Sequence, residues 1–216
     1  MEKLKTIYLG SYNNRLEYTD IEKLKEEAKK YGISIGDEVT IGDYVSISNS
    51  VTIRNNAKIG NDVSIGNGST IGNGAKIGRN TDIGDNVVVK FHATIGYASV
   101  IGDKVYIGYG STIGNCVTIG ENLAILARVN IKDEWKIEDI IHLKDEYRYN
   151  VSAYLVESKV VIQIGRVTRT IKEWDEDFWN NDCEFIKGTT AGVEMLIAFE
   201  KIKKIIEQKD KRWKLK

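Results

Sequence analysis

The chain has 216 residues, of which 42% are hydrophobic and 29% charged, a composition typical of a folded globular protein. Lysine plus arginine and aspartate plus glutamate each number 31, so bulk attraction to nucleic-acid polymers or to a membrane surface is not expected. The two cysteines, Cys116 and Cys183, are too few for a disulfide framework and lack metal-ligand spacing. The length favours one domain, or one domain with a small appendage.

The sequence also favours a cytoplasmic location. No apolar stretch approaches the length of a membrane span. A signal peptide needs a long apolar core, and none is present in the first ten residues, MEKLKTIYLG.

Residues 1–34 are predicted to form an N-terminal segment that contains one helix. Thr19 and Glu22 have the spacing of a capping box, which places the start of this helix near Thr19 and its end near Tyr31. The apolar residues on one face are Ile21, Leu24 and Ala28. We expect this helix to cover the open edge of the repeat that follows.

A six-residue repeat occupies residues 35–136. Every sixth residue from Ile35 to Ile131 is Ile at 16 of 17 positions, the exception being Val89, and Gly follows directly at 12 of them. Neither an amphipathic helix nor an ordinary strand keeps this period. The pattern therefore predicts a coil of about 17 short strands that stack on one another.

The repeat also predicts which side chains point inward. The aliphatic residue and the small or β-branched residue four positions later are expected to fill a narrow interior. The second and third residues after the aliphatic one are rich in Asn, Asp and Gly, which tolerate the positive φ of a tight corner. Three repeats make one coil of 18 residues, so residues 18 apart lie about 4.8 Å apart on adjacent coils.

The pattern [Ile/Val]-Gly-x-x-[small]-x resembles the hexapeptide-repeat superfamily, which includes UDP-N-acetylglucosamine acyltransferase, serine acetyltransferase and xenobiotic acetyltransferases. The resemblance covers about half of the chain. It implies a mainly β fold, a left-handed parallel β-helix, whose hand is an exception to the rule for parallel crossovers. It also implies a parallel homotrimer with ligand clefts between subunits. In the enzymes, a histidine in such a cleft acts as the base, and acyl-CoA or acyl carrier protein is the donor.

The tail, residues 137–216, is predicted to be a small α+β module. Residues 150–156 and 159–166 alternate in polarity and predict a β-hairpin. Thr170 and Glu173 form a second capping box, which predicts a short helix carrying Trp174, Phe178 and Trp179. Residues 190–208 predict an amphipathic helix with Met195, Phe199, Ile202 and Ile206 on its apolar face. The module resembles tails behind hexapeptide repeats in uncharacterised phage and bacterial proteins.

Two histidines, His92 and His142, are present, and histidine is the usual general base near neutral pH. His142 lies in the tail without recognisable company, so His92 is the candidate base. Its equivalents on the adjacent coils are Gly74 and Gly110, which would leave bare backbone on both sides of the imidazole.

The coil around His92 departs most often from the repeat. Val89 replaces Ile, Lys90 replaces Gly, and Phe91 is expected to stack on Tyr109 of the next coil. A cluster of departures in a regular repeat marks a candidate binding surface or subunit contact. Aromatic faces with basic side chains suit a nucleotide-like ligand. The candidate ligand-binding residues are Lys90, Phe91, His92, Tyr97, Tyr106 and Tyr109, together with Arg166 and Arg169 at the start of the second tail helix.

Three functions stay open at this stage. The first is a homotrimer that binds a small anionic ligand without turnover, such as a phage protein that sequesters a host signalling nucleotide. The second is an acyltransferase with His92 as base, and the third is a rigid trimeric spacer in which His92 is an ordinary corner residue and the aromatic residues form the subunit contact. The first is favoured because no loop interrupts the repeat, no carboxylate is placed beside His92, and His92 is one residue out of register with the acyltransferase pattern.

Overall fold

The computed structural model describes residues 4–11, 13–143, 150–157, 159–165, 167–177, 188–209 and 212–213. The candidate Arg166, Phe178 and Trp179 of the predicted short helix, and Cys183 lie outside the described residues. The chain divides into two compact units, Met1–Lys136 and Ile137–Lys216.

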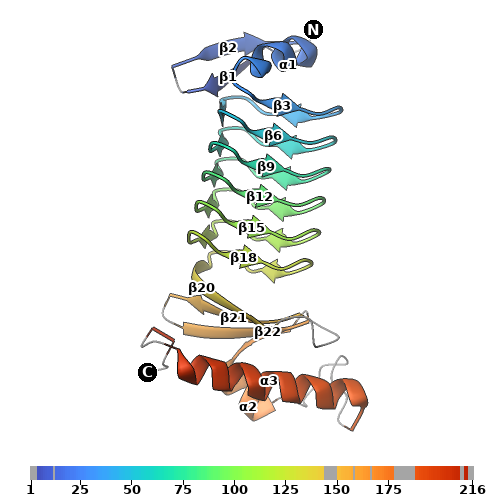
Figure 1. Cartoon of the computed structure of the whole chain (residues 1–216), viewed down its shortest axis with the longest axis vertical. Coiled ribbons are helices and arrows are strands. Elements are labelled where there is room, and N and C mark those ends of the chain that lie inside the picture. The colour runs from blue at the N-terminus through green and yellow to red at the C-terminus, as the bar shows by residue number, and fades with distance from the viewer. Residues whose placement is uncertain are drawn as a thin grey trace. The chain divides into compact units, whose positions relative to one another are not determined.

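The first unit is built around a coil of short parallel strands (Figure 1). The strands are β3 (Ser34–Ile35), β4 (Thr40–Ile41), β5 (Val45–Ser48), β6 (Thr52–Ile53), β7 (Lys58–Ile59), β8 (Ser64–Ile65), β9 (Thr70–Ile71), β10 (Lys76–Ile77), β11 (Asp82–Ile83), β12 (Val88–Val89), β13 (Thr94–Ile95), β14 (Val100–Ile101), β15 (Tyr106–Ile107), β16 (Thr112–Ile113), β17 (Thr118–Ile119), β18 (Ala124–Ile125) and β19 (Asn130–Ile131).

These strands form three sheets, one along each side of the coil. The β12 sheet has the order β18-β15-β12-β9-β6-β3 and the β13 sheet the order β19-β16-β13-β10-β7-β4. The β11 sheet contains β5-β8-β11-β14-β17. Partners are parallel and 18 residues apart, as in the pairing of Ile83 with Ile65 and Ile101. The predicted left-handed parallel β-helix is confirmed, and Lys58 pairs with Lys76 as the repeat requires.

The interior contains the aliphatic residue of the repeat. From Ile41 to Ile131 each of these side chains is at most 4% exposed, Val89 included. The small position four residues later is also buried at Ser69, Thr81 and Ser99. Their hydroxyls bond to backbone on the next coil, as when Ser69 Oγ donates to the Gly84 carbonyl at 2.8 Å. A hydroxyl is tolerated in this core because the stacked corner supplies its partner.

Each corner has one residue in the left-handed region of φ. It is the third residue after the aliphatic one, at all 17 repeats from Glu38 to Glu134, with φ between 53° and 66°. Three of these residues are glycine and 14 are not, so the prediction of positive φ is confirmed although glycine is not required there.

The second corner residue holds adjacent coils together through what we call the Asx ladder. In seven pairs it is an Asn or Asp whose Oδ1 accepts the backbone N–H of the residue 18 positions earlier, at 2.6–3.2 Å, whereas within residues 13–143 Asn73 does not accept the Asn55 N–H in this way. The donor and acceptor pairs are Asp37 and Asn55, Asp43 and Asn61, Asn49 and Asn67, Asn67 and Asp85, Asp85 and Asp103, Tyr97 and Asn115, and Asn115 and Asp133. The abundance of Asn and Asp in the corners therefore has a second cause besides turn conformation.

The N-terminal end of the coil is covered by a hairpin and a helix. Strands β1 (Lys5–Gly10) and β2 (Arg15–Tyr18) are antiparallel, and β1 pairs in parallel with β5, which extends the β11 sheet. This hairpin was not predicted. Helix α1 (Ile21–Lys29) follows, with Leu24 and Ala28 buried as expected.

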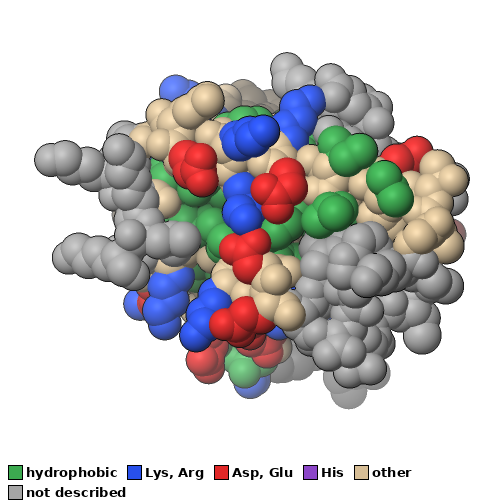
Figure 2. Space-filling model, turned by 90° about the horizontal axis from the view of Figure 1, so that it is seen from below, with side chains coloured by type: hydrophobic (Ala, Val, Ile, Leu, Met, Phe, Trp, Pro, Cys, Tyr) green, Lys and Arg blue, Asp and Glu red, His purple; other side chains and the backbone are tan. Residues whose placement is uncertain are grey.

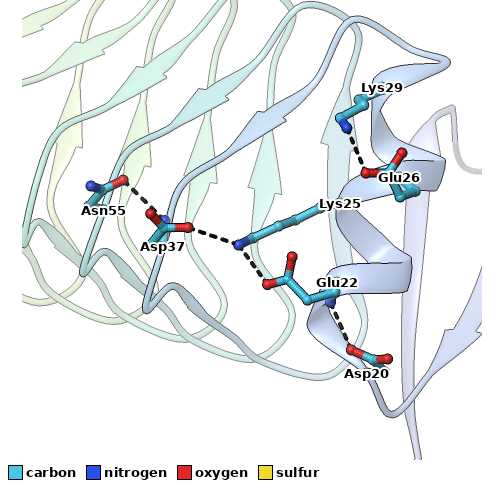
Figure 3. Close-up of polar contacts among 7 residues, drawn as sticks. All are labelled: Asp20, Glu22, Lys25, Glu26, Lys29, Asp37 and Asn55. Carbon is cyan, nitrogen blue, oxygen red and sulfur yellow. Dashed lines mark hydrogen bonds and ion pairs between the residues drawn. The ribbon is translucent and has the colours of Figure 1, made fainter.

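The cap of α1 differs from the predicted capping box. Asp20, one residue after Thr19, is the N-cap, and its Oδ1 accepts the Glu22 N–H at 2.9 Å. Figure 3 shows Lys25 reaching both Glu22 on its own helix and Asp37 on the first corner, with Nζ to oxygen distances of 2.8 and 3.2 Å. Lys25 therefore links the helix to the coil that it covers.

The described residues of the second unit form four antiparallel strands and two helices. Strands β20 (Lys136–Leu143), β21 (Val151–Val156), β22 (Lys159–Ile164) and β23 (Val167–Thr170) pair in that order. The predicted hairpin is β21–β22, whereas β20 and β23 were not predicted. Helices α2 (Ile171–Asp177) and α3 (Thr190–Gln208) correspond to the two predicted helices.

One face of this sheet packs on α2 and α3 in a core that includes Trp174 and Phe199. All four predicted apolar residues of α3 are buried: Met195, Phe199, Ile202 and Ile206. Figure 2 looks at the second unit from the side of α3, where acidic and basic side chains lie beside exposed hydrophobic ones. Val193 and Ile197 of α3 are 47% and 56% exposed.

Tyr18 is expected to make the stability of the first unit sensitive to alkaline pH. Its side chain is 8% exposed. Burial, together with the Asp43 carboxylate, raises the pKa of Tyr18 from 10.0 to about 12. Stabilisation by the neutral phenol is therefore complete below the unfolded pKa of 10.0 and is lost as the pH rises toward about 12.

Urea unfolding of wild type and Tyr18→Phe at pH values below, within and above this window tests the expectation. Tyr18→Phe should lose less stability across the window than wild type does. The exposed Tyr44 is the control, because Tyr44→Phe should follow wild type. Equal losses in wild type and Tyr18→Phe would contradict the assignment.

Candidate functional site

The candidate residues gather where the β12 sheet meets the corner that follows it. Lys90, Phe91 and His92 form the corner after β12, and Tyr109 lies in the equivalent corner one coil on. Tyr106 lies on the outer face of the β12 sheet, where it pairs with Val88. Phe91 and Tyr106 are 47% and 39% exposed.

The aromatic rings of this corner stack along the coil, as predicted. The rings of Phe91 and Tyr109 are 5.0 Å apart between centroids and inclined by 9°. The guanidinium carbon of Arg128 lies 5.1 Å from the Tyr109 centroid. His92 meets Phe91 edge-on, with centroids 5.8 Å apart and an interplanar angle of 82°. Phe91 is therefore an exposed ring that stacks on Tyr109 and meets His92 edge-on.

A hollow of about 180 Å³ lies beside Phe91, and we call it the Lys90 hollow. It is lined by Arg54, Thr70, Gly72, Asn73, Val88, Val89, Lys90 and Phe91. Arg54 and Lys90 occupy the same corner position two coils apart, with Gly72 between them. No acidic residue is among the lining residues, so the hollow presents two positive charges and one aromatic ring.

Arg54 was not among the predicted ligand-binding residues, although the sequence carried a signal for it. Arg54 and Lys90 both replace the glycine that usually follows the aliphatic residue, and their separation of 36 residues places them in one column. Lys90 also has a neighbour on the next coil, since its Nζ lies 5.6 Å from the Tyr106 centroid.

Tyr97 does not join this group. It lies in the corner after β13, at the edge of a different sheet, where the guanidinium carbon of Arg79 is 5.9 Å from its ring centroid. Four predicted residues, Lys90, Phe91, Tyr106 and Tyr109, therefore surround one site, with His92 at its margin.

His92 is an exposed corner residue with φ of 56°. Its backbone N–H donates to the Asn73 carbonyl at 2.9 Å, and a Cβ placed on Gly74 would lie 2.7 Å from its Nδ1. The ring is thus held against bare backbone, as the repeat predicted. Within residues 13–143 no carboxylate contacts the ring, so the partner that orients a general base is not supplied from this part of the chain.

Arg169, the remaining candidate among the described residues, lies in the second unit and has another contact. The guanidinium carbon of Arg169 is 5.0 Å from the Trp174 ring centroid. The start of α2 is occupied by a reciprocal capping box, in which Glu173 Oε2 accepts the Thr170 N–H at 2.7 Å. This carboxylate disfavours an anion at that helix end. His142 Nδ1 is 2.7 Å from Ser152 Oγ.

Residues 62–97 match the family model of the bacterial transferase hexapeptide (six repeats). The matched part of the coil is a hexapeptide-repeat β-helix. The matched residues of this hexapeptide-repeat coil include Lys90, Phe91 and His92. No curated protein matches the chain.

Solved structures similar to the hexapeptide-repeat coil include two of the acetyltransferase domain of PglB from Neisseria gonorrhoeae. One has 14% sequence identity and a TM-score of 0.26; the other, in complex with acetyl coenzyme A, has 15% and 0.24. Each covers 54% of this chain, which in turn spans 60% of that domain. The UDP-N-acetylglucosamine acyltransferase of Arabidopsis has 16% identity and a TM-score of 0.25, with 47% of this chain and 54% of that one covered.

Two features are absent from the described part of the chain. None of its helices is both long and apolar enough to cross a membrane. Among the same residues, no group of three or more His, Cys, Asp or Glu side chains is arranged to hold a metal ion.

Proposed function

We propose that the hexapeptide-repeat coil binds a small anionic, nucleotide-like ligand at the Lys90 hollow without turning it over. The observation that carries the proposal is the exposed Phe91 ring beside Arg54 and Lys90, in a hollow with no acidic lining residue. A nucleobase would stack on Phe91, and the phosphate would pair with the two cations. Within residues 13–143 no carboxylate contacts His92, which favours binding over turnover.

The proposal includes assembly as a homotrimer, in which a neighbouring subunit closes the open side of the hollow. The outer face of the β12 sheet suits such a contact because it is uncharged over six strands. Its residues are Ser34, Thr52, Thr70, Val88, Tyr106 and Ala124. For a cytoplasmic trimer of this kind, sequestration of a signalling nucleotide by a phage protein is a fitting role.

A second candidate function is acyl transfer from acyl-CoA or acyl carrier protein with His92 as base. The transferase family matched by residues 62–97 favours it, and His92 lies at the margin of the same site. Coenzyme A also contains an adenine nucleotide, so an anionic nucleotide would bind at Phe91 under either candidate function. They differ in whether His92 matters for a reaction.

Binding of ADP and of acetyl coenzyme A, measured by calorimetry on the full chain, tests the proposal. Lys90→Met is expected to weaken binding about ten- to a hundredfold, because it removes a charge-assisted hydrogen bond of about 1.5–3 kcal/mol. Lys76→Met is the matched control, since Lys76 is an exposed lysine on another sheet.

Several outcomes would overturn the proposal. They are the absence of nucleotide binding, equal binding by the Lys90 and Lys76 variants, or a monomer by light scattering. Turnover of acetyl coenzyme A that disappears in His92→Ala would establish the acyltransferase instead.

A further inference from the structure

The Asx ladder shows how a side-chain oxygen of the next coil satisfies a corner amide. In the corner of the β11 sheet, the Asn67 N–H donates to Asp85 Oδ1 at 2.6 Å, and the Asp85 N–H donates to Asp103 Oδ1 at 2.8 Å. A side-chain oxygen from the next coil thus satisfies each of these two amides. The regularity of the stack makes any amide without such an oxygen identifiable.

In the corner of the β12 sheet, Phe91 stands at the ladder position opposite the Asn73 amide. It occupies the position from which an Asn or Asp would accept the Asn73 N–H, and a phenyl ring has no acceptor. Within the described residues 13–143, the Asn73 N–H has no hydrogen-bond acceptor. Both Asn73 and Phe91 line the Lys90 hollow. The hollow is therefore bounded both by the residue whose amide lacks an acceptor and by the ring that stands in place of the acceptor.

The same hollow carries the positive charges that an incoming oxyanion needs. Arg54 and Lys90 line it, and Gly72 leaves the space between them without a side chain. A comparable interruption at Arg79, opposite the Asn61 amide, lacks this feature, because the corner position beside it is glycine in the neighbouring coils (Gly60, Gly78 and Gly96). At Phe91, by contrast, the amide without an acceptor, that of Asn73, lies beside two cations, Arg54 and Lys90.

We propose that a phosphoryl group of the ligand binds in the Lys90 hollow, one of its oxygens accepting the Asn73 N–H in place of the absent Asx oxygen. Arg54 and Lys90 neutralise its charge, and two cations suit the double charge of a phosphoryl group. This inference rests on the proposed nucleotide binding and adds which group enters the hollow. The base stacks on the face of the Phe91 ring that Tyr109 does not cover.

The test restores the missing acceptor. Phe91→Asn supplies the oxygen that Asn55, Asn61, Asn67 and Asn115 supply elsewhere, so it is expected to fold, to raise the melting temperature, and to bind pyrophosphate at least tenfold more weakly than wild type. Pyrophosphate is the probe, in calorimetry on the full chain. Arg79→Asn is the matched control, because it restores an acceptor for Asn61 in a column without flanking cations and should leave pyrophosphate binding unchanged.

Phe91→Ala separates loss of the ring from gain of an acceptor. It removes the stacking surface without satisfying the Asn73 amide, so ADP should bind about tenfold more weakly. Pyrophosphate should bind Phe91→Ala far more tightly than Phe91→Asn. Arg54→Gly and Lys90→Gly restore the usual residue of the repeat and should each weaken pyrophosphate at least tenfold. These two variants keep the test informative even when Phe91→Asn does not fold.

The proposal of a phosphoryl subsite is overturned when wild type does not bind pyrophosphate. It is overturned as well when Phe91→Asn binds pyrophosphate as tightly as Phe91→Ala does. It is also overturned when both glycine variants bind like wild type. Failure of the proposed function gives a different pattern, in which pyrophosphate follows these expectations while ADP binds no more tightly than pyrophosphate does.

Discussion

Trp174→Ala is expected to lower the free energy of unfolding of the second unit by about 3–5 kcal/mol, the range for truncating a large buried aromatic residue. Trp174 is 0% exposed, and its ring centroid lies 6.0 Å from that of Phe199. Its indole N–H also donates to the Ile162 carbonyl at 3.0 Å. Truncation would therefore leave a cavity between α2, α3 and the sheet and remove a hydrogen bond.

Urea unfolding followed by near-ultraviolet circular dichroism measures this loss. Trp174→Phe is the control, because it keeps an aromatic ring and loses the indole hydrogen bond and part of the volume, with a smaller expected cost of about 1–2 kcal/mol. A cost below about 1 kcal/mol for Trp174→Ala would show that the core rearranges around the gap. Ligand binding by the coil should be unaffected.

Gly78→Ala is expected to destabilise the coil by about 1–3 kcal/mol, because it forces extra volume into a packed structure. Gly78 follows the aliphatic residue of its repeat. A Cβ on Gly78 would lie 2.5 Å from both the carbonyl carbon of Gly96 and the backbone nitrogen of Tyr97 on the next coil. Backbone atoms cannot rotate away as a flexible side chain can, so the two coils must separate locally.

The matched control is Gly110→Ala, because Gly110 is a corner glycine and does not directly follow the aliphatic residue of its repeat. Gly110 has φ of 61°, and its nearest neighbour to a new Cβ is Arg128 Cγ at 3.8 Å. The substitution adds no clash and costs only the left-handed conformation, roughly 1 kcal/mol. Thermal unfolding by circular dichroism compares the two variants. A larger loss for Gly110→Ala than for Gly78→Ala would contradict the account of why glycine recurs in the repeat.

Most of the coil could be predicted from the sequence because its interactions repeat. A side chain in one repeat meets its equivalent 18 residues away, so the stacking of Phe91 on Tyr109 follows from register alone. The hand of the coil is different. It does not follow from residue spacing and was expected only from the family resemblance.

The ends of the coil were harder to predict because they contain no repeat. The hairpin of β1 and β2 has short strands, and β1 owes its position to pairing with β5 far along the chain. Choosing Asp20 over Thr19 as the cap of α1 depends on which residue adopts the extended conformation at the helix start. The identities of the neighbouring residues do not determine the local backbone geometry on which both features depend.

The candidate site was predicted in part. Lys90, Phe91, Tyr106 and Tyr109 come together because sheet register requires it, whereas Tyr97 lies at another corner. The hollow itself could not be predicted, since its volume depends on where the side chains of Arg54 and Lys90 point. The unpaired amide of Asn73 also appears only when the Asx ladder is seen across coils.

The sequence by itself determined the period of the coil, its inward-facing residues and the columns that stack, since all of these follow from counting in sixes. Only the tertiary structure decided which corner amides have acceptors, which cations flank the Lys90 hollow, and how the ends of the coil are covered. The physical reason is that register is a property of the repeat, whereas side-chain direction and empty space depend on all neighbouring atoms together. The candidate site of this chain depends on side-chain direction and empty space, and therefore on the tertiary structure.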